Sequence, residues 1–279
     1  MANDPSWSLT NTAGASSSGS ASGIRHSRTQ ALLAARGPKS DRAFVLVNGF
    51  EAWVDHPAGR SHLASQRYAP GITNPDEASR IESFTSKPRP TWRFKVDGDA
   101  HVTQEVELLP DRAVAAIRWS IAEDRRGFTL HVRPFLSGRD PNALHRRNEV
   151  LRTHTEKRGW KLSWRPYDGV PEINAYAMGV FDEDPLWYDN FQFDDRATED
   201  LFSPGIFHSP LFYGKPFELI LSAGWEEVVA GMILPEHPVL WAEAAPKEKA
   251  AKTASKARPK KGKKPSKTKG AGKKRPTKR

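Results

Sequence analysis

The sequence lacks several features that would identify a class of protein. None of its 279 residues is cysteine, which excludes disulfide bonds, a thiol nucleophile and a zinc site with cysteine ligands. No apolar run approaches the roughly 20 residues of a membrane-spanning helix. The first residues, MANDPSWSLTNTAG, have neither the basic start nor the apolar core of a signal peptide. We therefore expect a soluble, cytoplasmic protein.

Common catalytic and nucleotide-binding motifs are also missing. The sequence contains no HExxH, no GxSxG, no P-loop and no GxGxxG between a strand and a helix. Its nine histidines show no close pairing that would suggest a metal site. The sequence thus predicts no metal, no cofactor, no hydrolase triad and no nucleotide site.

The charge is unevenly distributed along the chain. Residues 247–279 hold 16 of the 43 Lys and Arg residues and one of the 33 acids, which gives this segment a net charge of +15. The remaining 27 basic and 32 acidic residues leave residues 1–246 with a net charge of −5. A body of that charge is a poor surface for nucleic acid.

Composition divides the chain into three parts. Residues 1–40 are rich in Ser, Gly and Ala with few large apolar side chains, which predicts a disordered leader. Residues 246–279 form a Lys/Ala/Pro-rich segment of low complexity, which predicts a disordered tail. The folded domain is therefore expected over residues 41–245.

Within that domain, alternating apolar residues predict β-strands. They occur in AVAAIRWSI (113–121), FTLHVRPF (128–135) and WKLSW (160–164), whereas FELILSAGW (217–225) and VVAGMIL (228–234) are uniformly apolar. Turn-forming pairs separate the runs: Asn48-Gly49, Asp97-Gly98, Pro110-Asp111, Arg126-Gly127 and Asp168-Gly169. This spacing, with little helix, predicts an all-β fold with minor α content, a large antiparallel sandwich of two sheets.

The stretch RPFLSGRDPNALHRRN (133–148) concentrates polar groups around one turn. We expect Arg133 at the end of a strand and a bend at Ser137-Gly138. Asp140 is a good N-cap and Pro141 suits the first helical position, so a short helix is expected to follow.

Several longer segments resemble one known family. These are residues 46–94 (LVNGFEAWVDHPAGRSHLASQRYAPGITNPDEASRIESFTSKPRPTWRF), RPFLSGRDPNALHRRN, WRPYDGVP (164–171), LWYDNFQF (186–193) and EDLFSPGIF (199–207). Their sequence and order resemble the N-terminal domain of bacterial and archaeal glycogen debranching enzymes of the amylo-α-1,6-glucosidase type. The resemblance spans roughly residues 43–235.

This resemblance implies a sandwich of the galactose-mutarotase-like kind, also called a supersandwich. In the family this domain precedes a helical (α/α) toroid, and the toroid carries the catalytic carboxylates. Here the basic tail follows the sandwich, so the resemblance transfers the fold and the glycogen context but no catalytic residue. We expect no α-1,6-glucosidase activity from the chain alone.

Seven residues of the body are candidates for sugar binding. Arginine and carboxylate groups beside aromatic rings can bind sugar hydroxyls while the rings stack on pyranose faces. The candidates are Trp53, Tyr68, Arg133, Arg139, Asp140, Trp187 and Tyr188. The alternative, which we favour, is structural: Asp140 caps its helix, and Arg139 braces the turn or faces the missing toroid. Many other acids are present, and no pair of them stands out as the two carboxylates of a glycosidase.

The basic tail predicts a second kind of binding. A disordered arm of this charge binds polyanions through counterion release without selecting a base sequence. The residues expected to contribute most are Lys260, Lys261, Lys263, Lys264, Lys273, Lys274 and Arg275.

Three functions therefore remain open. The first is a non-catalytic module of glycogen metabolism that binds α-glucan or docks onto a separately encoded toroid. The second is an enzyme, either a component of a split amylo-α-1,6-glucosidase that needs a partner or a reassigned mutarotase-like catalyst. The third is a protein that binds DNA or another polyanion through its tail.

Overall fold

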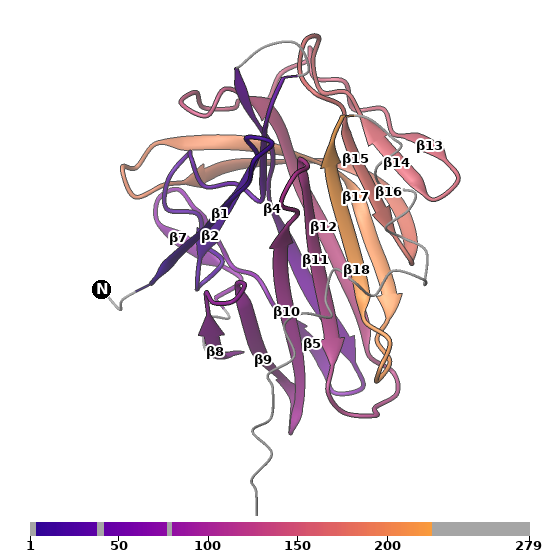
Figure 1. Cartoon of the computed structure of the whole chain (residues 1–279). Coiled ribbons are helices and arrows are strands. Elements are labelled where there is room, and N and C mark those ends of the chain that lie inside the picture. The colour runs from indigo at the N-terminus through magenta and orange to yellow at the C-terminus, as the bar shows by residue number, and fades with distance from the viewer. Residues whose placement is uncertain (1–3, 38–41, 77–79, 225–279) are drawn as a thin grey trace, which may run out of the picture.

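The computed structural model describes residues 4–37, 42–76 and 80–224, which form 18 β-strands and no α-helix. The strands make two antiparallel sheets that pack face to face (Figure 1). The described residues therefore contain no helix that could cross a membrane. The predicted sandwich of two sheets is confirmed.

The larger sheet has ten strands in the order β1-β2-β3-β4-β12-β17-β16-β6-β7, with β5 paired to β4. Its strands are β1 (Ser6–Thr10), β2 (Ser16–Ser20), β3 (Leu33–Arg36), β4 (Ala43–His56), β5 (Gly59–His62), β6 (Gln66–Tyr68), β7 (Ile72–Asn74), β12 (Thr129–Arg139), β16 (Val180–Gln192) and β17 (Thr198–Pro210).

The smaller sheet has eight strands in the order β13-β14-β15-β18-β11-β10-β9-β8. Its strands are β8 (Ile81–Thr85), β9 (Thr91–Asp97), β10 (Ala100–Leu108), β11 (Val114–Ile121), β13 (Glu156–Arg158), β14 (Lys161–Trp164), β15 (Ile173–Ala177) and β18 (Phe217–Ala223).

The core between the sheets follows the apolar alternation of the sequence. On β11, Ile117 and Trp119 are fully buried and belong to this core, as predicted from AVAAIRWSI. The indole nitrogen of Trp119 donates to Gln104 Oε1 at 2.9 Å, which satisfies the one polar atom that this ring buries. In WKLSW, Leu162 and Trp164 are buried as expected, but Trp160 lies in a turn and is 70% exposed.

The predicted disordered leader is wrong, because residues 6–36 form three strands of the larger sheet. β3 pairs with β4, and Leu33 is fully buried in the core. Trp7 on β1 also belongs to the core, with its ring 5.8 Å from that of Trp92. A serine-rich segment can join a sheet because its backbone pairs with existing strands, and a few apolar side chains suffice to anchor it. The domain therefore begins well before residue 41.

Two local predictions are also wrong. Asn48-Gly49 is not a turn but lies inside β4, where the Asn48 side chain donates to Glu199 across the sheet. No helix follows Asp140, and β12 continues past Ser137-Gly138 to Arg139.

The start of the expected helix is nevertheless present. Asp140 Oδ1 accepts the backbone N–H of Asn142 at 2.9 Å, and the N–H of Ala143 is bonded to the Asp140 carbonyl. The chain does not continue as a helix because His145 is bonded to Asp200 on β17. The Asp200 N–H donates to the His145 carbonyl, and His145 Nδ1 is hydrogen-bonded to the Asp200 carbonyl. Tertiary contacts here outweigh local helix propensity.

The predicted strand VVAGMIL and the basic tail lie outside the described residues.

We expect Leu33→Ala to lower the free energy of unfolding by about 2–5 kcal/mol, the usual cost of a cavity left by a buried leucine. Denaturant unfolding followed by tryptophan fluorescence measures this loss. Val150→Ala serves as the control, because Val150 is 76% exposed and its truncation should change stability by less than about 0.5 kcal/mol. Equal stabilities for the two variants would contradict a packed N-terminal segment.

Candidate functional site

The larger sheet turns one face toward the smaller sheet and one face away from it, and strand residues alternate between the two. On β12, Leu130 and Val132 belong to the core between the sheets. Phe135 belongs instead to a separate cluster with Phe191 and Leu201. We call the side that carries Phe135 the outer face.

Three strands contribute a row of rings to the outer face. His131 on β12 lies opposite both Trp53 on β4 and His208 on β17. Its ring centre is 5.0 Å from that of Trp53, with nearly parallel planes, and 5.6 Å from that of His208. Asp55 lies 3.1 Å from His131 Nε2. Burial holds the pKa of His131 below its usual range even though Asp55 favours the charged form, so this imidazole is neutral at neutral pH.

The next row on the outer face combines acids, an arginine and a tyrosine. Arg133 lies opposite Glu51 in the β4–β12 register. Its Nη2 donates to Asp184 Oδ2 at 2.6 Å, and its guanidinium carbon lies 5.8 Å from the centre of the Tyr188 ring. The Tyr188 hydroxyl lies 3.5 Å from Glu51 Oε2. Arg133 therefore lies in the middle of β12 and joins three strands, rather than at a strand end as predicted.

Two tyrosines, Tyr68 and Tyr188, remain protonated beside Glu51. Tyr68 on β6 packs against Phe191 with ring centres 4.9 Å apart. Burial, and then the nearby Glu51 carboxylate, raise the pKa of Tyr188 to about 12 and also raise that of Tyr68. Both phenols are donors at neutral pH, next to a carboxylate that accepts. Such an arrangement suits neutral hydroxyl groups, which both donate and accept.

Trp53 and Trp187 are not free stacking surfaces. Trp53 is 7% exposed, with His131 stacked on its ring and the Arg60 guanidinium carbon 5.0 Å from its ring centre. Trp187 points away from the side occupied by Tyr188, its chain neighbour. It stacks on His145 with ring centres 5.5 Å apart. Of the seven predicted sugar-binding residues, the structure thus brings together Trp53, Tyr68, Arg133 and Tyr188 on the outer face.

The other two candidates, Arg139 and Asp140, have structural partners. Asp140 closes the turn described above, and Arg42 Nε lies 3.5 Å from its Oδ2. Arg139 is buried and donates to Glu199 Oε2 at 2.7 Å and to the backbone carbonyl of Arg28 at 2.6 Å. Its bracing role is the interpretation that the sequence favoured, although it braces the N-terminal segment as well as the turn.

Glu199 is the centre of a buried ion network. This carboxylate on β17 is fully buried and accepts from Arg25 Nη1, Arg139 Nε and Asn48 Nδ2, at 2.5, 2.7 and 3.2 Å. Burial opposes its ionisation, but the two guanidinium groups outweigh burial and hold the pKa of Glu199 below its usual range. The network's contribution to stability is thus complete at neutral pH and is lost as the pH falls through this lowered pKa.

We expect Glu199→Gln to lower the free energy of unfolding by about 3–5 kcal/mol, because it leaves two buried guanidinium groups without a counter-charge. Denaturant unfolding at neutral pH measures the change. Asp189→Asn is the matched control. It removes an ion pair at the surface, in which the side chain of Arg147 is 53% exposed and that of Asp189 43% exposed. The free energy of unfolding should fall by only about 0–1 kcal/mol. A similar small cost for Glu199→Gln would show that the network does not stabilise the fold.

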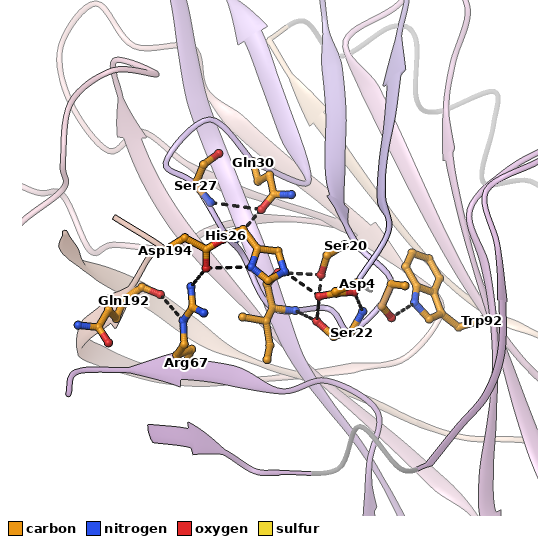
Figure 2. Close-up of polar contacts among 12 residues, drawn as sticks. Asp4, Ser20, Ser22, His26, Ser27, Gln30, Arg67, Trp92, Gln192 and Asp194 are labelled. Atoms are coloured by element: carbon orange, nitrogen blue, oxygen red, sulfur yellow. Dashed lines mark hydrogen bonds and ion pairs between the residues drawn. The ribbon is translucent and has the colours of Figure 1, made fainter. Parts of the chain in front are cut away.

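A second polar cluster fastens the N-terminal segment at its surface (Figure 2). His26 Nε2 lies 2.7 Å from Asp4 Oδ2 and its Nδ1 3.1 Å from Asp194 Oδ1. Arg67 Nη2 also donates to Asp194, at 2.5 Å. Burial disfavours the charged imidazole, but the two carboxylates outweigh it and raise the pKa of His26 above its usual range. The contribution of His26 is therefore complete in acid and is lost as the pH rises through its folded pKa.

We expect His26→Gln to reduce stability more at about pH 5.5 than at about pH 8.5, because the wild-type imidazole loses its charge as the pH rises through its raised pKa. Denaturant unfolding of both proteins at the two pH values tests this. His154→Gln is the control, since His154 is exposed and should show no such difference. A stability loss for His26→Gln that is larger at high pH would contradict the assigned charge state.

Comparison with known proteins identifies the domain. Residues 6–217 match the family described as "Glycogen debranching enzyme N terminal". The chain belongs to this family. The match begins in β1 and ends in β18, so it includes the N-terminal strands that composition alone assigned to a leader. The resemblance seen in the sequence motifs is confirmed.

Among solved structures, a bacterial glucoamylase complexed with acarbose is similar to the chain. The TM-score is 0.38 and the sequence identity 10%, and the alignment covers 82% of this chain and 34% of the glucoamylase chain. This chain thus spans about a third of the length of the structure that it matches. A search of the curated proteins finds no match.

Sequence reasoning missed the residues that organise the site. Arg25 lies in the segment taken for a leader, and Glu199 was quoted only as part of a family motif. One available signal was the position of Glu199, since an acid in a strand with apolar neighbours such as Leu201 and Phe202 needs a buried partner. Among the described residues, no group of three His, Asp or Glu could hold a metal ion.

The seven basic residues predicted to bind polyanions, Lys260, Lys261, Lys263, Lys264, Lys273, Lys274 and Arg275, lie outside the described residues. Binding of DNA or another polyanion through them stays a prediction.

Proposed function

We propose that this domain is a non-catalytic accessory module of α-glucan breakdown and that its outer face contacts the glucan. The observation that carries the proposal is the row formed by Glu51, Arg133, Asp184 and Tyr188. It places the carboxylates of Glu51 and Asp184 and the protonated phenol of Tyr188 on one sheet face, where the buried guanidinium of Arg133 holds Asp184 and lies beside Tyr188. Sugar hydroxyls pair with both donors and acceptors, so they suit this set better than a uniformly charged ligand would.

Membership in the debranching family supports a glucan as the ligand class. The proposal assigns no bond-breaking step to this chain, because the sequence resemblance places the family's catalytic carboxylates in a domain other than this one. Contact with a long polymer at a sheet face requires no deep pocket, since several weak contacts along the polymer add up.

We expect Tyr188→Ala to weaken glycogen binding by about tenfold or more, equivalent to about 1.4 kcal/mol. Affinity electrophoresis in glycogen-containing gels and calorimetry with maltoheptaose measure the effect. Tyr213→Ala is the matched control, because Tyr213 is a 63% exposed tyrosine in the loop between β17 and β18. Full-affinity binding by Tyr188→Ala, or no binding by the unaltered chain, would count against the outer face.

Exposed apolar side chains favour a second candidate, docking onto a separate catalytic protein as part of a split glucosidase. Trp160 and Met178 are 70% and 64% exposed and lie just beyond the Lys161–Tyr176 pair of β14 and β15. Exposed apolar groups that gather in this way are typical of protein contacts. Gel filtration of the chain with a separately produced toroid-type glucosidase tests it, and loss of co-elution in Trp160→Ser/Met178→Ser would support it.

A further inference from the structure

A cavity of about 60 Å³ lies between the two sheets, next to the β1–β2 hairpin. Its walls come from β1, β2, β4 and β6 of the larger sheet and from β8, β9 and β10 of the smaller one. By the same measure a single water molecule needs about 10–15 Å³, so the cavity has room for roughly four to six waters. That volume corresponds to one six-membered ring with its substituents.

Aromatic rings give the cavity rigid, apolar walls. Trp7, Phe50, Trp92 and Phe94 line it. The rings of Trp7 and Trp92 meet edge to face, and Phe50 packs edge to face on the buried Trp119 at 5.4 Å. Since Trp7, Trp92 and Phe50 are each held by a neighbouring ring, the cavity is preformed for a flat ligand body.

Three amide side chains in the walls each use either their oxygen or their NH₂ group in a hydrogen bond within the protein. Gln104 Oε1 accepts from Trp119, which leaves its amide N–H groups as donors. Gln66 Nε2 donates to the Phe50 carbonyl, which leaves its oxygen as an acceptor. Asn48 Nδ2 donates to Glu199, and Asn48 Oδ1 is buried without a hydrogen-bond partner in the part of the chain that the structure describes.

The indole nitrogen of Trp7 is a second buried polar atom in these walls without a partner among the described residues. Buried polar groups are nearly always paired, so two such atoms around one cavity call for a ligand that supplies both a donor and an acceptor.

The charge of the walls excludes ionic ligands. Among the described residues that line the cavity, Arg25 is the one that carries a charge, and its guanidinium pairs with Glu199 and lies over the rings of Phe191 and Phe193. An anion or a cation in this space would be buried without a counter-charge, at a high cost in free energy.

We infer that this cavity binds one uncharged ring bearing several hydroxyl groups, the size of a single pyranose unit. The C–H faces of such a ring pack on the aromatic walls. Its hydroxyls donate to the oxygens of Asn48 and Gln66 and accept from the N–H groups of Gln104 and Trp7. The site is distinct from the outer face and does not depend on the glucan contact proposed there.

The rim of the site is fastened to the smaller sheet and to the start of the chain (Figure 2). Trp92 Nε1 donates to the Ala21 carbonyl at 2.7 Å. Asp4 accepts from the backbone N–H and the hydroxyl of Ser22, at 2.8 and 2.5 Å. The loop 20–23 thus holds its place beside the cavity, as a preformed site requires.

Saturation-transfer NMR and calorimetry of the full chain test the inference with four probes: glucose, maltose, cyclohexanol and glucose 6-phosphate. We expect saturable binding of glucose or maltose, and at least tenfold weaker binding of the ring without extra hydroxyls and of the charged sugar. No saturable binding of either neutral sugar, or equal binding of all four probes, would overturn the inference.

Two variants place the binding in the cavity. Trp7→Phe keeps an aromatic wall and removes an N–H that forms no hydrogen bond among the described residues, so it should weaken glucose binding about tenfold with little loss of stability. Gln104→Glu keeps the acceptor for Trp119 and replaces the amide donors, so it should also weaken glucose binding about tenfold, at a larger cost in stability because it buries a carboxyl group. Tyr213→Phe, at an exposed tyrosine, should bind glucose normally. Unchanged glucose binding by both cavity variants would overturn the inference.

Tyr188→Ala separates this site from the proposed glucan contact. It should lower glycogen binding and leave glucose binding intact. If it abolished glucose binding while Trp7→Phe did not, the cavity inference would fail and the outer-face proposal would stand.

Discussion

The buried carboxylate of Glu199 between Arg25 and Arg139 is the interaction on which the arrangement of the larger sheet depends. Arg25 comes from the N-terminal segment, Arg139 from the end of β12 and Glu199 from the start of β17. Removing Glu199 would leave two buried guanidinium groups without a counter-charge. Arg25 and Glu199, which lie more than 100 residues apart in the sequence, are therefore fixed to one another because each buried charged group needs a partner.

The same network connects the two proposed sites. Asn48 donates to Glu199 and also lines the cavity, while the ring of Phe191, on which the Arg25 guanidinium lies, belongs to the outer-face cluster with Tyr68 and Tyr188. Rigid second partners of this kind hold binding groups at their working positions. Loss of the network would thus affect both faces of β4 at once.

The sequence was a good guide where one periodicity decided the structure. Alternation in β11 and in the first half of β12 predicted which side chains face the core, because a strand with one buried face leaves its register little freedom. It failed where a long-range partner overrode a local preference. Asn48-Gly49 has the composition of a turn, yet Asn48 is held in a strand by Glu199. Asp140 begins a turn, yet the contacts of His145 with Asp200 prevent a helix.

The candidate site was only partly predictable for the same reason. Arg133, Tyr68 and Tyr188 were chosen by residue type, but their assembly depends on the pairing of β4, β12, β17, β16 and β6. Trp187 shows why residue type alone is not enough. Neighbouring residues on a strand point to opposite faces of the sheet, so Trp187 lies on the face opposite to that of Tyr188 and outside the candidate site. The segment around Arg25 could not be placed from composition, because an ion pair with Glu199 on β17 leaves no trace in local hydropathy.

The way that β2 joins β3 has a consequence for dynamics. β1 and β2 pair with each other along five residues, whereas β2 meets β3 at the single register pair Ser16 and Ala34, supplemented by the bond from the Ser18 N–H to the Ala31 carbonyl. The β1–β2 hairpin is thus well paired internally but is joined to β3 by few backbone hydrogen bonds. Its amide hydrogens should exchange with solvent together, through an opening that leaves the rest of the sandwich folded. Such an opening would widen the cavity from the side, so a ligand bound there would leave faster when the hairpin opens more often.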